Sequence, residues 1–437
     1  MSKTLPAKDV VIVGGGWTGS IIGKELAANG QSVVVLERGQ PRWPSPDFQA
    51  PTVHDELKYT RRHELHQNTA VETFTFRNTP SEQALPMRRW QFAFPATHVG
   101  GAGNHWLGAY YRFDETEFKF RSHYTEKYGA KILSPDITPQ DWPLTYDELE
   151  PYYDRFDYLI GASGYAGNLN EKLQPNGNPF DPWRSRQYPN PPLKVPYASA
   201  LFGEAAAKMG YHPYVQPSAL VSRPYTNSEG LNMNACVYCG FCSNYGCEHF
   251  AKASPQVCVL PAAMKLSNFE LRANAHVLRV ELTPDKKKAR GVTYVDASGE
   301  ECFQPAEMVF LCAFGIHNVR LLLLSGIGRP YDPATREGAV GRAYTHQTTS
   351  SVNLFFDEKV NINPFMGAGA AAVRVDDFNS DNFDHGPLGF VGGGYIQIQV
   401  VGGAPIGYRP VPKGTAGWGS EWKQAARRHY NHSIPIT

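Results

Sequence analysis

Four of the seven cysteines in this chain lie within the segment "NACVYCGFCSNYGCEHF", residues 234–250. Cys236, Cys239 and Cys242 are each separated by two residues, and Cys247 follows after four more. Thiolates at this spacing let a short loop surround an iron–sulfur cluster. Structural zinc more often uses two cysteine pairs separated by a longer loop, and disulfides between such close cysteines are strained. The spacing favours a cluster, with zinc, disulfides or free thiols as the alternatives.

A second chemical motif lies near the N-terminus, where Gly14, Gly16 and Gly19 form the pattern GxGxxG. The first glycine allows a tight turn, the second lets the backbone approach a pyrophosphate, and the third lets the helix pack close to the strand. Glu37 follows Gly19 by 18 residues, where an acid can bind a ribose hydroxyl. The motif predicts a dinucleotide site, and the acid favours an unphosphorylated ribose, as in FAD or NAD.

The elements that must position these residues follow from hydrophobic periodicity. Residues 9–39 predict a strand, a turn, a helix ending at Asn29-Gly30 and a second strand. Further along, 141–161 and 198–210 predict helices, and 306–328 predicts a strand followed by an apolar helix. Residues 269–283 and 289–300 predict a strand pair, and 391–403 predicts a strand. Strands alternating with helices indicate an α/β fold.

The composition limits the classes of function. The 437 residues are 42% hydrophobic and 19% charged, enough for two or three folded domains. The net charge of +1 gives no electrostatic support for a nucleic-acid partner. No apolar window is long enough to span a membrane, and the N-terminus lacks the features of a leader peptide. We therefore expect a chain that stays in the cytoplasm or is exported folded with a partner that carries the signal.

Three further segments carry a family resemblance: "VGGAGNHWLGAYYRF" (99–113), "AFGIHNVRLLLLSGIG" (313–328) and "VGRAYTHQ" (340–347). Together with residues 9–39 they resemble the glucose–methanol–choline (GMC) oxidoreductases over nearly the whole chain. The cysteine segment is similar to that of one group in this family, the flavoprotein subunits of membrane-bound gluconate, fructose, sorbitol and glucose dehydrogenases. Gluconate dehydrogenases are the nearest of these.

The resemblance implies the fold and the cofactor. It implies an FAD-binding Rossmann-like domain of the GMC and pyranose oxidase type and a β-rich α+β substrate domain. The expected limits are 8–345 for the FAD domain, with an iron–sulfur insertion at about 232–252, and 346–437 for the start of the substrate domain. The family's catalytic pair, a His followed by His or Asn, would lie beyond the end of this chain. We therefore expect a truncated chain without its catalytic base.

The resemblance also implies residue roles. The segment 99–113 would contact the flavin, and the sequence "GNHW" has the pattern of "STHW" in pyranose oxidases, where the His is bonded covalently to the flavin. His105 would then carry the covalent FAD, although a buried, hydrogen-bonded His beside Trp106 fits the sequence equally well. The residues expected to bind FAD in addition to the GxGxxG glycines and Glu37 are Gly100, Gly101, Gly103, Asn104, His105 and Val277.

The same resemblance implies the reaction and the partners. FAD would oxidise an alcohol of a sugar or sugar acid, and a [3Fe-4S] cluster would pass the electrons to a cytochrome c subunit and then to quinone. Such a cluster takes three of the four cysteines, whereas a four-iron cluster takes all four. A small subunit with an export signal would bring the chain to the periplasmic side of the inner membrane. The alternatives are a cytoplasmic location and an inactive flavin-binding scaffold.

Overall fold

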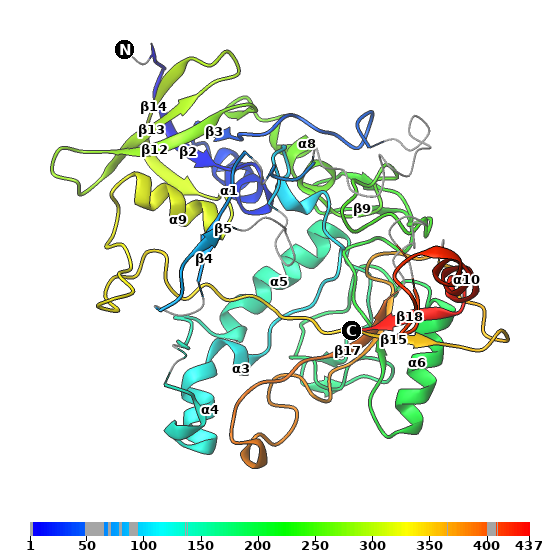
Figure 1. Ribbon diagram of the computed structural model, residues 1–437. Coiled ribbons are helices and arrows are strands. Elements are labelled where there is room, and N and C mark those ends of the chain that lie inside the picture. The colour runs from blue at the N-terminus through cyan, green and yellow to red at the C-terminus, as the bar shows by residue number, and fades with distance from the viewer. Residues whose placement is uncertain are drawn as a thin grey trace.

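Figure 1 shows the computed structural model of the chain. The structure describes residues 3–48, 65–68, 71–77, 81–86, 95–135, 137, 139–364, 366–399, 408 and 410–437. Two sheets organise these residues and lie on opposite sides of the view, with the helix α5 (Tyr146–Ile160) between them.

The first sheet has seven strands, in the order β11-β3-β2-β14-β13-β12, with β1 pairing β14 in addition. The parallel part joins β11, β3, β2 and the second half of β14, and the antiparallel part joins the first half of β14 to β13 and β12. Val10–Val13 and Val33–Leu36 are buried, as expected for parallel strands covered on both faces. The strands are β1 (Lys3–Thr4), β2 (Lys8–Val13), β3 (Val33–Leu36), β11 (Phe269–Arg272), β12 (His276–Leu282), β13 (Ala289–Val295) and β14 (Glu301–Leu311).

Helix α1 (Trp17–Ala28) crosses this sheet directly after β2, and close packing depends on its glycines. A methyl group at Gly19 would overlap the carbonyl oxygen of Gly14, and one at Gly23 would lie 3.0 Å from the ring of Phe269. Helix α9 (Gly315–Leu324) follows β14 and contacts β12. The predicted strand–helix–strand unit at 9–39 and the strand–helix pair at 306–328 are both present.

The second sheet has five antiparallel strands in the order β15-β18-β17-β16-β8. Helix α6 (Tyr197–Lys208) packs against it, and Ala198 joins Ile398 and Ile434 in the core. Because β8 and α6 precede residue 346, this sheet also uses chain from within the predicted FAD domain; the domain limits themselves stay a prediction. The strands are β8 (Tyr214–Val215), β15 (Val352–Phe355), β16 (Ala372–Val375), β17 (Ile396–Gln399) and β18 (Ser433–Ile436).

The remaining elements are short or peripheral. Residues 269–283, predicted as one strand, form two, because Asn274 has a left-handed φ of 52° and ends the first. None of the helices in the described ranges is long and apolar enough to cross a membrane. These elements are β4 (Thr75–Phe76), β5 (Leu85–Pro86), η3 (Gly101–Gly103), α3 (Glu115–Phe118), α4 (Phe120–Tyr128), η4 (Ala130–Ile132), β6 (Asn168–Leu169), β7 (Lys172–Leu173), β9 (Tyr225–Thr226), β10 (Asn232–Met233), α7 (Pro255–Cys258), α8 (Leu260–Ala263), η5 (Gly386–Leu388) and α10 (Gly419–His429).

Candidate functional site

The predicted dinucleotide site is a cavity at the carboxyl ends of the parallel strands. Gly14, Gly16, Glu37 and Val277 line it, as do Gly101 and Gly103 of the flavin segment, residues 99–113. A methyl group at Gly16 would meet no atom within 4 Å, so the backbone there is open to an incoming group. The N-terminus of α1 has no side-chain cap, which leaves its first N–H groups available to a phosphate. This geometry fits the pyrophosphate of FAD.

Glu37 is held at the edge of this cavity by two backbone donors. The N–H of Gly15 donates to Oε2 at 2.9 Å, and the N–H of Gly39 donates to Oε1 at 2.8 Å. Burial raises the pKa of Glu37, and these two N–H groups act in the opposite direction. Each carboxylate oxygen retains a lone pair for a ribose hydroxyl. The position fits the predicted role.

The flavin segment packs directly on the GxGxxG turn. The N–H of Gly100 donates to the carbonyl of Gly15 at 2.9 Å, and a methyl group at Gly101 would lie 3.2 Å from Cα of Gly16. Gly100 has a φ of 90°, and a side chain there would overlap Gln256. The glycines are therefore required to bring two loops together, and they leave Ala102 and Gly103 facing the cavity.

Four of the residues predicted to bind FAD do not line the cavity, namely Gly19, Gly100, Asn104 and His105. Nδ2 of Asn104 donates to the carbonyl of Val99 at 2.9 Å, so this amide shapes its own loop. His105 is buried, with its ring centroid 4.4 Å from that of His66 and 5.9 Å from that of His98. This group of three histidines was not visible in the sequence. Flavin contact by Asn104 and a covalent bond to His105 stay predictions.

The four cysteines of the loop 236–247 all line one small cavity, together with Phe241 and Tyr245. All seven cysteines are free thiols, so the structure contains no disulfide between them. No three of the four loop sulfurs come within 4.8 Å of one another in this metal-free structure. Burial raises the pKa of the Cys236 thiol to about 12 and that of Cys242 to about 11. A positively charged multi-iron core would favour the thiolates that burial disfavours. The donor set therefore fits an iron–sulfur cluster.

The cysteine loop is bonded to the flavin segment at two points. The N–H of Asn244 donates to the carbonyl of His105 at 2.8 Å. Lys252, which is 1% exposed, donates from Nζ to the carbonyls of Trp106, Cys242 and Tyr245 at 2.8, 2.7 and 2.8 Å. The predicted cluster and the predicted flavin site are thus parts of one connected structure.

A larger cavity, of about 710 Å³, lies between the flavin segment and the second sheet. Leu107 and Tyr111 of the flavin segment line one side, and Arg374, Gln397 and Gln399 of β16 and β17 line the other. Of the strand predicted at 391–403, the structure has β17 at Ile396–Gln399 and residues 400–403 lie outside the described residues; Gln397 and Gln399 both line the cavity. His346 is the single histidine among the described lining residues, and the location of the catalytic pair stays a prediction.

Arg374 is one of three buried arginines among the described residues that line this cavity. Its Nε donates to Oδ1 of Asp376 at 2.6 Å, and its guanidinium lies 3.7 Å from the ring centroid of Tyr395 and 4.6 Å from that of Tyr111. Nη1 of Arg374, Oε1 of Gln397 and Nε2 of Gln399 are buried without a hydrogen-bond partner within the described ranges. Buried polar groups normally have partners, so these three atoms fit a polar ligand that carries several oxygens.

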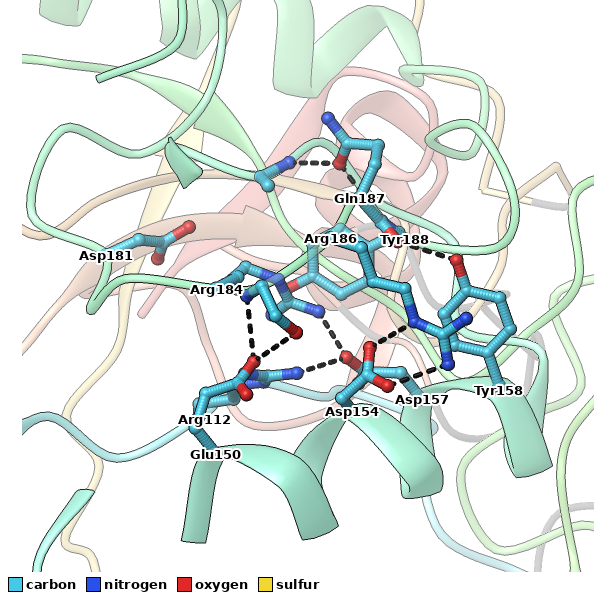
Figure 2. Close-up of polar contacts among 12 residues, drawn as sticks. Arg112, Glu150, Asp154, Asp157, Tyr158, Asp181, Arg184, Arg186, Gln187 and Tyr188 are labelled. Carbon is cyan, nitrogen blue, oxygen red and sulfur yellow. Dashed lines mark hydrogen bonds and ion pairs between the residues drawn. The ribbon is translucent and has the colours of Figure 1, made fainter. Parts of the chain in front are cut away.

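One wall of the cavity is built on a network of buried ion pairs, shown in Figure 2. Asp157 of α5 accepts from Nη2 of Arg112 at 2.7 Å and from Nη2 of Arg184, and Arg112 also donates to Glu150 at 3.1 Å. Burial is the largest single effect and lowers the pKa of Arg112, but the charge of Asp157 and the neighbouring Tyr146 and Tyr110 together outweigh it, so the pKa is raised. The network fixes two cavity residues, Arg112 and Arg184, to a rigid helix.

Lys252, Arg374 and the residues of this network are candidate site residues that the sequence analysis did not identify. Each looks like an ordinary charged residue in the sequence, and its environment depends on contacts with distant segments, such as those of Lys252 with Trp106, Arg112 with Asp157 and Arg374 with Tyr111. The composition and the motifs give no signal for such contacts.

Comparison with known proteins agrees with this geometry. Residues 9–156 match the family described as FAD dependent oxidoreductase, and residues 222–349 match the family described as GMC oxidoreductase. The chain is 47% identical to the gluconate 2-dehydrogenase flavoprotein of Pantoea cypripedii, over 100% of this chain and 71% of that protein. It is 26% identical to the 2-methyl-1,2-propanediol dehydrogenase of Mycolicibacterium austroafricanum, over 100% of this chain and 72% of that protein.

Among solved structures, a formate oxidase variant from Aspergillus oryzae aligns with a TM-score of 0.52 and 16% identity, over 99% of this chain and 72% of that one. This likeness concerns the fold, and it confirms the predicted α/β architecture with an FAD-binding domain. The protein is an FAD-dependent oxidoreductase that acts on CH–OH groups. On the strength of the 47% identity across its full length, the chain belongs to the GMC oxidoreductase family.

Proposed function

We propose that this protein is the flavoprotein subunit of a sugar-acid dehydrogenase, with gluconate oxidised to 2-ketogluconate. The relative with 47% identity is named gluconate 2-dehydrogenase flavoprotein, which supports the substrate class. Electrons leave through an iron–sulfur cluster held by Cys236, Cys239, Cys242 and Cys247, of the [3Fe-4S] type if three of them bind iron. The observation that carries the proposal is the direct bond between Asn244 of the cysteine loop and His105 of the flavin segment.

In this proposal the chain's own residues bind FAD in one cavity and orient the substrate in the other. FAD, when bound, accepts the hydride of the alcohol carbon. The open backbone at Gly16 receives the pyrophosphate, and Glu37 receives a ribose hydroxyl. In the larger cavity, Nη1 of Arg374 meets the substrate carboxylate, and Gln397 and Gln399 bond its hydroxyls. The aromatic rings over Arg374 hold its guanidinium plane in place.

The partners belong to the same proposal. A small subunit carries the export signal, and a cytochrome c subunit receives the electrons and passes them to quinone on the periplasmic side of the inner membrane. A fructose, sorbitol or glucose dehydrogenase of the same group is the second candidate for the substrate. An inactive flavin-binding scaffold is the remaining alternative.

The experiment uses the full-length protein purified anaerobically with its partner subunits. Iron and acid-labile sulfide are measured per FAD, and electron paramagnetic resonance (EPR) spectra are recorded before and after adding gluconate, fructose, sorbitol or glucose. We expect the cluster signal to change with gluconate at the lowest concentration. Cys239→Ala should remove iron and keep FAD, whereas Cys302→Ala, which alters a buried thiol in β14, should keep both. A wild-type protein without iron, or one that no substrate reduces, would contradict the proposal.

A further inference from the structure

The buried lysine between the two redox segments carries the inference. Lys252 follows the cysteine loop, yet its Nζ donates to Trp106 of the flavin segment as well as to Cys242 and Tyr245 of the loop. Three carbonyl acceptors require three N–H donors, which an ammonium has and a neutral amine lacks. The geometry therefore defines a positively charged group at this point.

No carboxylate in the described part of the chain lies within 4.0 Å of this ammonium to form an ion pair with it. An isolated buried charge is costly, and proteins keep it only where something compensates it. Burial lowers the pKa of Lys252, and the charges of the Cys242, Cys247 and Cys239 thiolates act in the opposite direction, so these thiolates are the candidates for compensation. A cluster held by thiolates carries net negative charge, which increases by one on reduction.

The three hydrogen bonds of Lys252 also hold two segments of the chain together. The three carbonyl groups come from two segments that are more than a hundred residues apart in sequence, and one side-chain nitrogen holds them together. The bond from the N–H of Asn244 to the carbonyl of His105 joins the same two segments. Lys252 thus determines how the cysteine loop sits against the flavin segment.

We infer that Lys252 is a positioning residue for electron transfer, whose ammonium fixes the cysteine loop against the flavin segment and whose charge favours the reduced cluster. The inference rests on the proposed function, since it requires that the loop hold iron. Each transfer removes one electron from reduced FAD and adds one electron to the cluster, which then passes it to the one-electron acceptor. A fixed positive charge beside the cluster stabilises the state in which the cluster holds the extra electron.

The expected effect of the Lys252 charge on reduction of the cluster follows from Coulomb's law. A unit charge acting over roughly 10 Å at an effective dielectric constant near 20 changes an equilibrium by about tenfold. Lys252→Gln removes the charge and keeps two N–H donors, so the equilibrium constant for one-electron reduction of the cluster should fall by about tenfold. For a one-electron couple this is a downward shift of about 59 mV in the midpoint potential. Lys252→Arg keeps the charge and should stay within about twofold of the wild type.

The experiment is a redox titration followed by EPR on the full-length protein, with iron per FAD measured on the same samples. Lys265→Gln is the matched control, because it removes an exposed lysine 13 positions further along the chain. Stopped-flow measurements should show unchanged flavin reduction by gluconate and about tenfold slower flavin reoxidation in Lys252→Gln. Loss of iron in Lys252→Gln, with iron retained in Lys252→Arg and Lys265→Gln, would also support the inference.

Equal midpoint potentials in wild type and Lys252→Gln would overturn the inference, and so would equal loss of iron or FAD in both Lys252 variants. In these cases the wild type still contains the cluster, and the proposed function stands. A wild type that contains no iron would instead refute the cluster itself, together with any role of Lys252 towards it. The two failures are therefore distinguished by the iron content of the wild type.

Discussion

Replacing Asp157 by Asn should destabilise the protein strongly, because it leaves two buried guanidiniums facing a neutral amide. Asp157 is 0% exposed, and its Oδ2 accepts from both Arg112 and Arg184 (Figure 2). Removing one partner from a buried ion pair costs about 3–5 kcal/mol. A value near 4 kcal/mol corresponds to roughly a thousandfold change in the unfolding equilibrium.

The same helix provides the matched control. Asp154 lies one turn earlier and makes two bonds of 2.7 Å to Arg186, whose side chain is 50% exposed. Exposed pairs contribute about 0–1 kcal/mol, so Asp154→Asn should change stability by less than about 1 kcal/mol. Both substitutions remove one charge from α5 and change the side chain by the same atoms, and they differ mainly in burial.

The measurement is equilibrium unfolding in urea, followed by tryptophan fluorescence at equal FAD saturation. We expect a large drop in midpoint for Asp157→Asn and nearly no drop for Asp154→Asn, with similar slopes. If the two variants shift the midpoint equally, or if Asp157→Asn costs less than about 1 kcal/mol, the reasoning about the buried network is wrong. Flavin reduction by substrate should also slow in Asp157→Asn at temperatures where it is folded, since Arg112 and Arg184 line the cavity.

Three further predictions concern the two cavities. Gly16→Ala should fold normally, because a methyl group there meets no protein atom, but it should lose FAD, because the methyl group occupies the space of the pyrophosphate. Gly19→Ala should also lower the melting temperature, because its methyl group overlaps Gly14. Equal melting temperatures in the two apoproteins would contradict this. Burial and the neighbouring Asp114 raise the pKa of Glu117 from 4.5 to about 7, so its ionised form opposes folding above pH 7 and this cost disappears as the pH falls to 4.5. Glu117→Gln should therefore stabilise the protein at pH 8 and have little effect near pH 4, as thermal unfolding at both values would show. Arg374→Gln should raise the KM for gluconate by about 10- to 100-fold and that for a neutral sugar alcohol much less, and a parallel rise for both would argue against a carboxylate contact.

The sequence predicted those parts of the site that depend on backbone shape. Gly14, Gly16 and Gly19 have a local requirement, since only glycine fits the turn and the close packing, and such a requirement is visible in the order of residues. The cysteine spacing is local in the same way. The flavin contact of Asn104, which the family resemblance implies, stays a prediction, and the bond from its Nδ2 to the carbonyl of Val99 is a contact that the sequence does not reveal.

The remaining features depend on which segments meet in space. Lys252 is five residues after Cys247 in the sequence, but its contact with Trp106 joins positions 146 residues apart. Similarly, the cavity around Arg374 needs a flavin segment near residue 107 and a sheet beyond residue 370. Long-range contacts of this kind shape the site, and they leave no periodic pattern in the sequence from which they could be predicted.

The strand order of the second sheet has a consequence for synthesis on the ribosome. Strand β18 (Ser433–Ile436) pairs with β15 on one side and β17 on the other, so β15 has no neighbour until β18 has been made. The first sheet is complete once residue 311 has emerged, more than a hundred residues earlier. In the first part of that interval, before β16 and β17 have been made, β8 and α6 lack their partner strands. The nascent chain therefore exposes unpaired strand edges after the first sheet is complete, when a chaperone that shields β-strand edges would be most effective.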